Sequence, residues 1–344
     1  MERYNFTDLM KLLLALLLVV AHCASEIVRF PAIIDLFFSL YVVVVPFFLC
    51  ISSFFLFRKI YRAADYKEQL SLYRAYSFRV LGLYALWGGI YMFLHILSWW
   101  KSGVTPREVY HYFHEVLVYS TYPTIWFLPA LWVAVSCVFI LHIKCKFRIS
   151  GVFVLSVVLY LIGVAGYSYS DLLPFPLKKL ADGYEFVFIT WRNGLFNGFV
   201  FCTIGAFLAG QKFRRFSWVD LLLCFLFGGG FACEAFLMKK ISPISDANFL
   251  ILLIPFTYFF VKTVNRISLK NSLAYRVTRH LSSLIFLSQR LFITAFPALL
   301  PNCVVVGLMA NPYVGTGIVL GCTVLFSVLL LWASAKWNVL KLMY

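Results

Sequence analysis

The sequence predicts an all-α, polytopic integral membrane protein, and its composition and patterning both support this fold class. Hydrophobic residues fill 62% of the 344 positions, far above the share usual in a soluble domain. Apolar runs of about 20 residues, the length of a helix that crosses a bilayer, recur from end to end. Because lipid offers no hydrogen bonds, each run must satisfy its backbone internally, as a helix does.

Ten apolar segments can be marked, and the short loops between them leave no room for a soluble domain. We therefore expect a single membrane domain over residues 1–344, built as a bundle of about ten transmembrane helices. The first segment lacks a small-residue cleavage site, so we interpret it as a span rather than a signal peptide. The segments cover residues 10–29, 33–57, 78–100, 124–143, 149–168, 193–211, 218–237, 247–265, 280–300 and 313–335.

The distribution of lysine and arginine predicts the orientation of the chain. With the N-terminus in the cytoplasm, 21 of these residues fall on the cytoplasmic side and 8 on the other, as the positive-inside rule requires. Both termini are then cytoplasmic, in a multi-pass protein of the inner or plasma membrane. The net charge of +16 reflects this topology and contact with anionic lipid rather than nucleic-acid binding. The oligomeric state stays open.

The metal-binding residue types form no convincing site. The nine cysteines are scattered without a C-x-x-C pair, so we interpret them as small packing residues. His111, His114 and Glu115 stand at near-helical spacing, but no fourth ligand is apparent. We therefore expect no metal.

The first segment carries ionisable residues where lipid makes them costly. In "DLMKLLLALLLVVAHCASE", Lys11 and His22 are eleven residues apart. Eleven residues advance a helix about 20° beyond three full turns, so the two side chains share a face about 16 Å apart. Glu26 lies one turn further along that face. This register suits a base oriented by a carboxylate, with a phosphate held at Lys11; a buried histidine satisfied by a neighbouring helix is the alternative.

Other stretches extend this pattern along the chain. They are "SSFFLF" in the second segment, Arg79 with Tyr84 and Trp87 in the third, "WFLPAL" at Trp126–Leu131, "RNGLFNG" at Arg192–Gly198, and Glu234 in the seventh. Together with Asp8, Lys11 and His22 in the first helix, these motifs resemble the membrane acyltransferase-3 family in order and spacing. The resemblance covers nearly the whole chain and includes the ten-helix count.

The resemblance implies transfer of an acyl group, commonly acetyl, from cytoplasmic acyl-coenzyme A to a hydroxyl of an extracytoplasmic or lipid-linked glycan. It implies that His22 acts as general base or transient acyl carrier, that Glu26 orients it, and that Lys11 and Arg79 hold donor phosphates. The expected substrate-binding residues are Trp126, Arg192, Asn193 and Glu234.

The chain departs from the family pattern at a few positions. The residues before "WFL", where many relatives have a histidine, are Thr124 and Ile125, and Gln289 stands where a late helix often ends in one. Tyr76 occupies the place of a frequent second arginine. A transporter or flippase of polysaccharide precursors is the main alternative function, and it predicts matched halves with broken helices, which the sequence does not show. A catalytically silent family member is the other.

Overall fold

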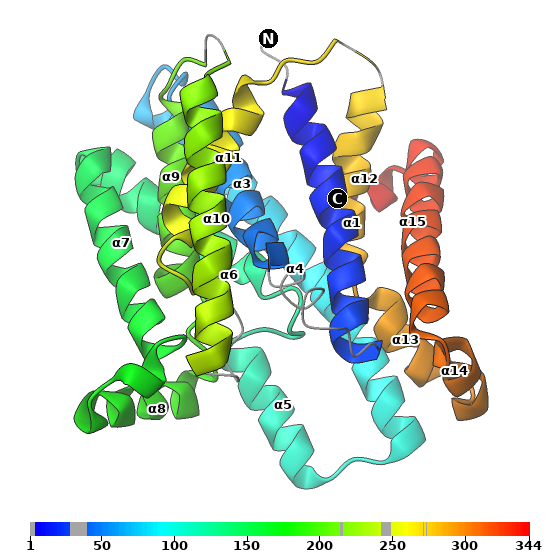
Figure 1. The fold of residues 1–344 in the computed structure, drawn as a ribbon. Helices are drawn as coiled ribbons and strands as arrows, with labels where there is room; N and C mark the ends of the chain where they lie inside the picture. The colour runs from blue at the N-terminus through cyan, green and yellow to red at the C-terminus, as the bar shows by residue number, and fades with distance from the viewer. Residues whose placement is uncertain (1–3, 28–39, 214–215, 242–248, 271, 273) are drawn as a thin grey trace. The chain divides into compact units, whose positions relative to one another are not determined.

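The structure is a computed structural model that describes residues 4–27, 40–213, 216–241, 249–270, 272 and 274–344. The side chains of residues 24–27, 40, 276 and 312 lie outside this description. The described part is helical, with no strand (Figure 1). Its helices are α1 (Asn5–Ile27), α3 (Val44–Ile60), α4 (Tyr66–Ser102), α5 (Pro106–Val118), α6 (Phe127–Val138), α7 (Ile149–Gly166), α8 (Phe175–Phe188), α9 (Phe199–Ala209), α10 (Trp218–Ile241), α11 (Leu253–Arg266), α12 (Ala274–Ser288), α13 (Leu291–Leu299), α14 (Asn302–Met309) and α15 (Pro312–Lys336).

Among the described residues, seven helices are long and apolar enough to cross a bilayer. The pair α12 and α13 makes an eighth span if its 47° bend is counted within one crossing. Helix α10 exposes Leu222, Phe225 and Leu226, a contiguous apolar surface that only lipid or another protein would cover. The chain is therefore a multi-pass membrane protein.

The expected count of ten spans is not confirmed. The segments predicted at 193–211 and 247–265 correspond to a shorter apolar helix, Gly194–Ala209, and to α11 with 14 residues. A helix of that length rises about 21 Å, which is less than the ~30 Å hydrocarbon core. The cytoplasmic placement of the termini stays a prediction.

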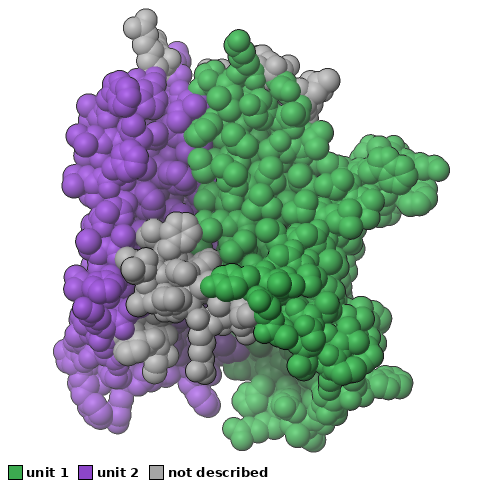
Figure 2. Space-filling view, turned by 45° about the vertical axis from the view of Figure 1, so that its right-hand side comes forward, with its two compact units in different colours: residues 1–41, 82–125, 268–344 green, residues 42–81, 126–267 purple. Residues whose placement is uncertain are grey.

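The chain divides into two compact units that interleave in sequence, coloured separately in Figure 2. Unit 1 comprises residues 1–41, 82–125 and 268–344, and unit 2 comprises residues 42–81 and 126–267. The predicted single domain over 1–344 is thus built from two clusters of contacts. Neither cluster is a continuous stretch of sequence, so no single cut of the chain separates them.

In unit 2, α9 packs tightly against α3 because a glycine lets the two backbones approach. A side chain added at Gly205 would meet the backbone carbonyl of Cys50. One turn away, the buried hydroxyl of Ser53 donates a 2.6 Å hydrogen bond to the carbonyl of Cys202. Small residues and a serine hydroxyl are what close helix packing in lipid requires.

The turn that leads into α9 packs against α6 in the same way. Gly194 and Gly198 lie one helical turn apart, and a side chain at either would meet the carbonyl of Ala130. At Gly198 it would also press on the Cβ of Ala134, one turn further along α6. The paired small residues thus form a small-xxx-small interface.

The basic stretch predicted as the 58–79 loop is mostly helical, because α4 begins at Tyr66. Asp65 accepts a 2.7 Å hydrogen bond from the Glu68 N–H, and Glu68 accepts one from the Ala64 N–H. This reciprocal cap starts the helix. The residues that follow contain neither proline nor glycine before Gly82, so nothing interrupts it.

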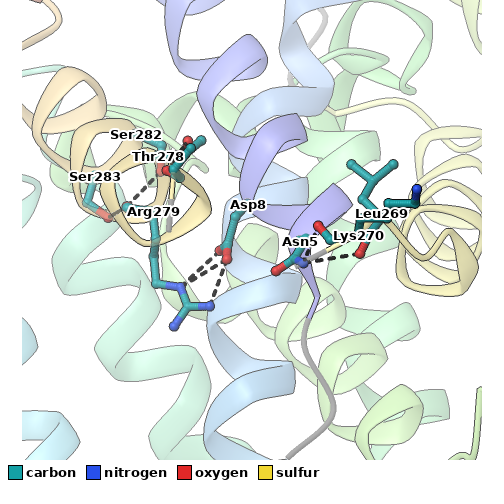
Figure 3. Close-up of polar contacts among 9 residues, drawn as sticks. Asn5, Asp8, Leu269, Lys270, Thr278, Arg279, Ser282 and Ser283 are labelled. Atoms are coloured by element: carbon teal, nitrogen blue, oxygen red, sulfur yellow. Dashed lines mark hydrogen bonds and ion pairs between the residues drawn. The ribbon is translucent and has the colours of Figure 1, made fainter. Parts of the chain in front are cut away.

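In unit 1, an ion pair fixes the first turn of α1 to α12 (Figure 3). The carboxylate of Asp8 is buried and accepts two hydrogen bonds of 3.1 Å from Nε of Arg279 and one of 2.7 Å from its Nη2. Asn5 adds hydrogen bonds from Nδ2 to the carbonyls of Leu269 and Lys270. A forked guanidinium contact of this kind sets direction as well as distance.

We predict that the two halves of this pair contribute unequally to stability. The side chain of Asp8 is 1% exposed and that of Arg279 is 52% exposed. Arg279→Met leaves a buried carboxylate without its counter-ion and should cost about 3 kcal/mol. Asp8→Leu leaves a guanidinium that water can still reach and should cost about 1 kcal/mol. Thermal unfolding in detergent measures both.

The double variant Asp8→Leu with Arg279→Met serves as the control, since it removes both charges. Its melting temperature should lie above that of Arg279→Met alone. Equal losses in the two single variants would contradict the proposed asymmetry.

Candidate functional site

The register predicted for Lys11 and His22 is present in the structure, because α1 is one continuous α-helix from Asn5 to Ile27. Both side chains are half-buried. The His22 ring lies edge-to-face against the ring of Tyr41, with 6.1 Å between centroids. A histidine inside an apolar helix is therefore reachable, although it is largely surrounded by protein.

The two residues lie toward opposite ends of α1. Lys11 is six residues after the first residue, Asn5, about 9 Å along the axis, and His22 is five residues before the last, Ile27, about 8 Å. Lys11 therefore lies near the N-terminal end of α1, and His22 lies near its C-terminal end.

Two predicted partners of this pair are placed differently. Glu26 belongs to α1 by its backbone, but its side chain is outside the described part, so its role in orienting His22 stays a prediction. Arg79 is an exposed residue in the first half of α4. It belongs to unit 2, whereas Lys11 belongs to unit 1, and their joint binding of phosphate also stays a prediction.

Asn193, predicted to bind substrate, begins a helix. Its Oδ1 accepts hydrogen bonds of 2.9 and 3.0 Å from the N–H groups of Leu195 and Phe196, and its Nδ2 donates to Tyr184. These contacts use the side chain fully as a helix N-cap. Its neighbour Arg192 is half-buried, and its Nε contacts the hydroxyl of Thr190 at 3.4 Å.

Trp126 is buried at the start of α6, beside the helix face that receives Gly194 and Gly198. The motifs "WFLPAL" and "RNGLFNG" are thus the two sides of one helix-packing interface. The motif "SSFFLF" lies on α3 and includes Ser53, which bonds to α9. Three of the family-like motifs are therefore explained by packing inside unit 2.

Glu234 also has a structural explanation. Its carboxylate accepts hydrogen bonds from the N–H groups of Ile251 (2.6 Å) and Leu252 (2.8 Å), just before α11 begins, and from the hydroxyl of Tyr169 (2.6 Å). Burial and the contact with Glu234 raise the pKa of Tyr169, so the phenol keeps its proton and donates. These three bonds satisfy the start of a helix that lipid cannot solvate.

A polar cluster that sequence reasoning did not identify as a site lies at the break between α12 and α13, which we call the helix break (Gln289–Arg290). The Nε2 of Gln289 donates a 3.4 Å hydrogen bond to the carbonyl of Thr124. In the acyltransferase-3 pattern a histidine is frequent at the stretch occupied here by Thr124 and Ile125, and another at the place of Gln289. This shared departure could have suggested from the sequence that the two stretches lie together.

Neighbouring side chains explain why the helix breaks there. The buried hydroxyl of Tyr91 donates to the carbonyl of Leu287 at 3.0 Å, and Ser288 bonds back to the carbonyl of Leu284 at 2.7 Å. Side-chain hydroxyls that enter the backbone ladder in this way bend helices.

The helix break also lies near the catalytic candidate on α1. Arg290 is close enough to Cys23 for the two to interact electrostatically, and Cys23 directly follows His22. The Arg290 guanidinium lies 5.8 Å from the ring centroid of Tyr122. In the described residues, no group of three histidine, cysteine, aspartate or glutamate side chains could hold a metal ion.

We predict that Glu234 is a stability determinant. Glu234→Gln replaces one acceptor oxygen by an NH2 group, which is a donor and cannot bond to a backbone N–H. This change should lower the free energy of unfolding by about 2 kcal/mol. Tyr169→Phe removes one donor only and should cost about 1 kcal/mol. Thermal unfolding should therefore rank wild type above Tyr169→Phe and Tyr169→Phe above Glu234→Gln; a Glu234→Gln variant as stable as wild type would refute this role.

Comparison with known proteins finds no similar family, protein or structure. No protein-family model matches this chain, and neither a curated protein nor a solved structure matches it. The likeness to the acyltransferase-3 family is therefore a prediction that rests on the motifs themselves.

Proposed function

We propose that the chain is an integral membrane O-acyltransferase that moves an acyl group from cytoplasmic acyl-coenzyme A to a hydroxyl of an extracytoplasmic or lipid-linked glycan. The family resemblance implies that this group is acetyl. One observation carries the proposal: α1 holds a half-buried His22 and, three turns away on the same face, Lys11. An ionisable pair at this spacing inside an apolar helix is costly unless it is used.

The proposed chemistry needs one base. His22 takes the proton of the acceptor hydroxyl while the hydroxyl oxygen attacks the thioester carbonyl carbon. The carbon–sulfur bond then breaks, and the proton passes from the imidazole to the departing thiolate. The products are an O-acyl ester and free coenzyme A, so atoms and charge balance. Positioned proton transfer of this kind contributes about 10²- to 10⁴-fold in rate.

The proposed donor site is the Lys11 end of α1. A lysine ammonium binds phosphate oxygens as a point charge, and we propose that Arg79 assists it. The distance of about 16 Å along α1 from Lys11 to His22 lets an extended thioester arm present its carbonyl at the histidine. We propose that this end faces the cytoplasm, as the excess of lysine and arginine there predicts.

One observation favours the transporter alternative. The α12–α13 pair is a span bent by 47°, and broken helices often form transport sites. A transporter built from repeats would show a second, corresponding break. The bent pair is the single such pair in the part of the chain that the structure describes, so we retain acyl transfer as the primary proposal.

We predict that His22→Ala lowers acyl transfer at least ~10²-fold, the lower end of general-base contributions. The measurement is incorporation of label from acetyl-coenzyme A into glycans of membranes that contain the protein. His95→Ala is the matched control, since His95 is also a half-buried histidine within a spanning helix, where it stacks on Tyr112. It should retain transfer. Near wild-type transfer by a correctly inserted His22→Ala variant would exclude the mechanism.

We also predict that donor and product appear on opposite sides of the membrane. Labelled acetyl-coenzyme A should acylate glycan in sealed inverted vesicles and not in right-side-out vesicles. The labelled ester should be protected inside the inverted vesicles from an added esterase until detergent opens them. Permeabilised vesicles of both kinds control for enzyme amount. Product that is open to the esterase without detergent would exclude transfer across the bilayer.

A further inference from the structure

Two buried oxygen atoms, one in the helix break and one beside it, have no hydrogen-bond partner among the described residues. They are Oε1 of Gln289 and Oγ1 of Thr124, and the two side chains belong to residues that are 2% and 6% exposed. The residues are joined by the bond from Nε2 of Gln289 to the carbonyl of Thr124. The two oxygens therefore belong to one small cluster.

The orientation of the Gln289 amide is determined by its contact. The Thr124 carbonyl can only accept, so the nitrogen of the amide must face it. The remaining oxygen, Oε1, must then accept from another group. The hydroxyl of Thr124 lies beside the phenol of Tyr91 without a hydrogen bond of acceptable geometry, and Tyr91 gives its own proton to Leu287. Among the described residues, none therefore donates a hydrogen bond to Oε1.

The start of α13 adds donors at the same break. Its first intrahelical bond runs from the N–H of Thr294 to the carbonyl of Arg290, so the N–H groups of the first turn have no acceptor within the helix. Arg290, the residue before α13, makes no side-chain capping bond to them. Leu291, the first residue of α13, is buried. Phe292 and Ile293, which follow it, are half-buried, so this turn is partly shielded from solvent.

An unpaired acceptor and unpaired donors inside a membrane protein are costly, because lipid satisfies neither. A group that both donates and accepts would relieve both. An alcohol does this: its O–H donates to a carbonyl-type oxygen, and its oxygen accepts from an N–H. A carboxylate or phosphate only accepts when ionised and would leave Oε1 unsatisfied.

We infer that the helix break binds a hydroxyl group of a sugar, with Gln289 Oε1 as the acceptor of its proton and the Thr124 hydroxyl as a second contact. As the acceptor site of an acyltransferase, the inference rests on the proposed function. Cys23 directly follows His22 and lies near Arg290, so a sugar held there would be near the proposed base. Gln289 and Thr124 are positioning and specificity residues in this scheme, since His22 carries out the proton transfer.

Sugar binding can be measured without any acyl donor. The full chain is placed in phosphatidylcholine nanodiscs, free of sugar detergents, and titrated with methyl glycosides of glucose, galactose, rhamnose and N-acetylglucosamine. Saturation-transfer difference NMR reports binding in the millimolar range. At least one glycoside should bind. Gln289→Met, which keeps the length of the side chain and removes its oxygen, should weaken that binding about tenfold, the effect of losing one hydrogen bond in a buried site.

A second variant separates binding from stability. Thr124→Val removes the hydroxyl with little change of shape and should weaken the same glycoside. Thr257→Val is the matched control, because Thr257 on α11 is fully buried with an unpartnered hydroxyl and lies in the other unit. It should bind the glycoside like wild type. The melting temperature of Thr124→Val should be equal to or above that of wild type, since it removes an unsatisfied polar atom. That of Gln289→Met should be close to wild type, since it removes an unsatisfied oxygen together with the hydrogen bond to the Thr124 carbonyl.

The binding results distinguish a sugar-binding site from a helix break whose polar atoms are satisfied by water alone. If none of the glycosides binds, or if Gln289→Met and Thr124→Val bind as wild type does, water alone satisfies these atoms and the inference is wrong. The binding experiment contains no acyl-coenzyme A, so it does not depend on acyl transfer. Sugar binding can therefore be observed even if the His22→Ala variant keeps full transfer activity. The failure of the acyl-transfer proposal is thus distinguishable from the failure of this one.

Discussion

The bilayer imposes the constraint on which this structure depends: a polar group within an apolar helix must find its partner inside the protein. Several described carboxylates follow this rule, although a number of buried polar atoms, among them those of Trp191 and Thr257, have no hydrogen-bond partner among the described residues. Asp8 is paired with Arg279, Asp220 of α10 with Lys262 and Arg266 of α11, and Glu234 with two backbone amides. Two of the ionisable residues that look functional in the sequence, Asp8 and Glu234, are therefore explained by contacts between helices. The informative residues are those that this explanation does not cover.

The sequence predicted the helical class, the membrane setting and most span positions, since composition and run length decide these. It did not predict that 193–211 and 247–265 form short helices, because a hydropathy run does not show where a chain turns. It also missed that α4 extends over the basic loop, where the Asp65–Glu68 cap and uninterrupted helix-forming residues outweigh charge. The face shared by Lys11 and His22 was predictable because a regular helix determines it.

The roles of the candidate site residues were harder to predict than their positions. Glycine-rich motifs such as "RNGLFNG" are conspicuous in a sequence because small residues are required wherever two helices touch. Gly194 and Gly198 meet the Ala130–Ala134 face, and Asn193 starts the helix that carries them. A motif of this kind therefore indicates close packing of two helices. It indicates a functional site only if it also contains a polar group that the packing does not explain.

That distinction bears on where the chemistry of this chain lies. The motifs explained by packing belong to unit 2, whereas Lys11, His22 and the helix break belong to unit 1. Gln289 is a single glutamine in an ordinary-looking stretch, and only its burial, its bond to Thr124 and its unsatisfied oxygen identify it. The unsatisfied oxygen of this buried amide carries a cost to stability. Such a cost is typical of residues that serve a ligand rather than the core, which is why the helix break, and not the more visible motifs, is where substrate recognition is to be sought.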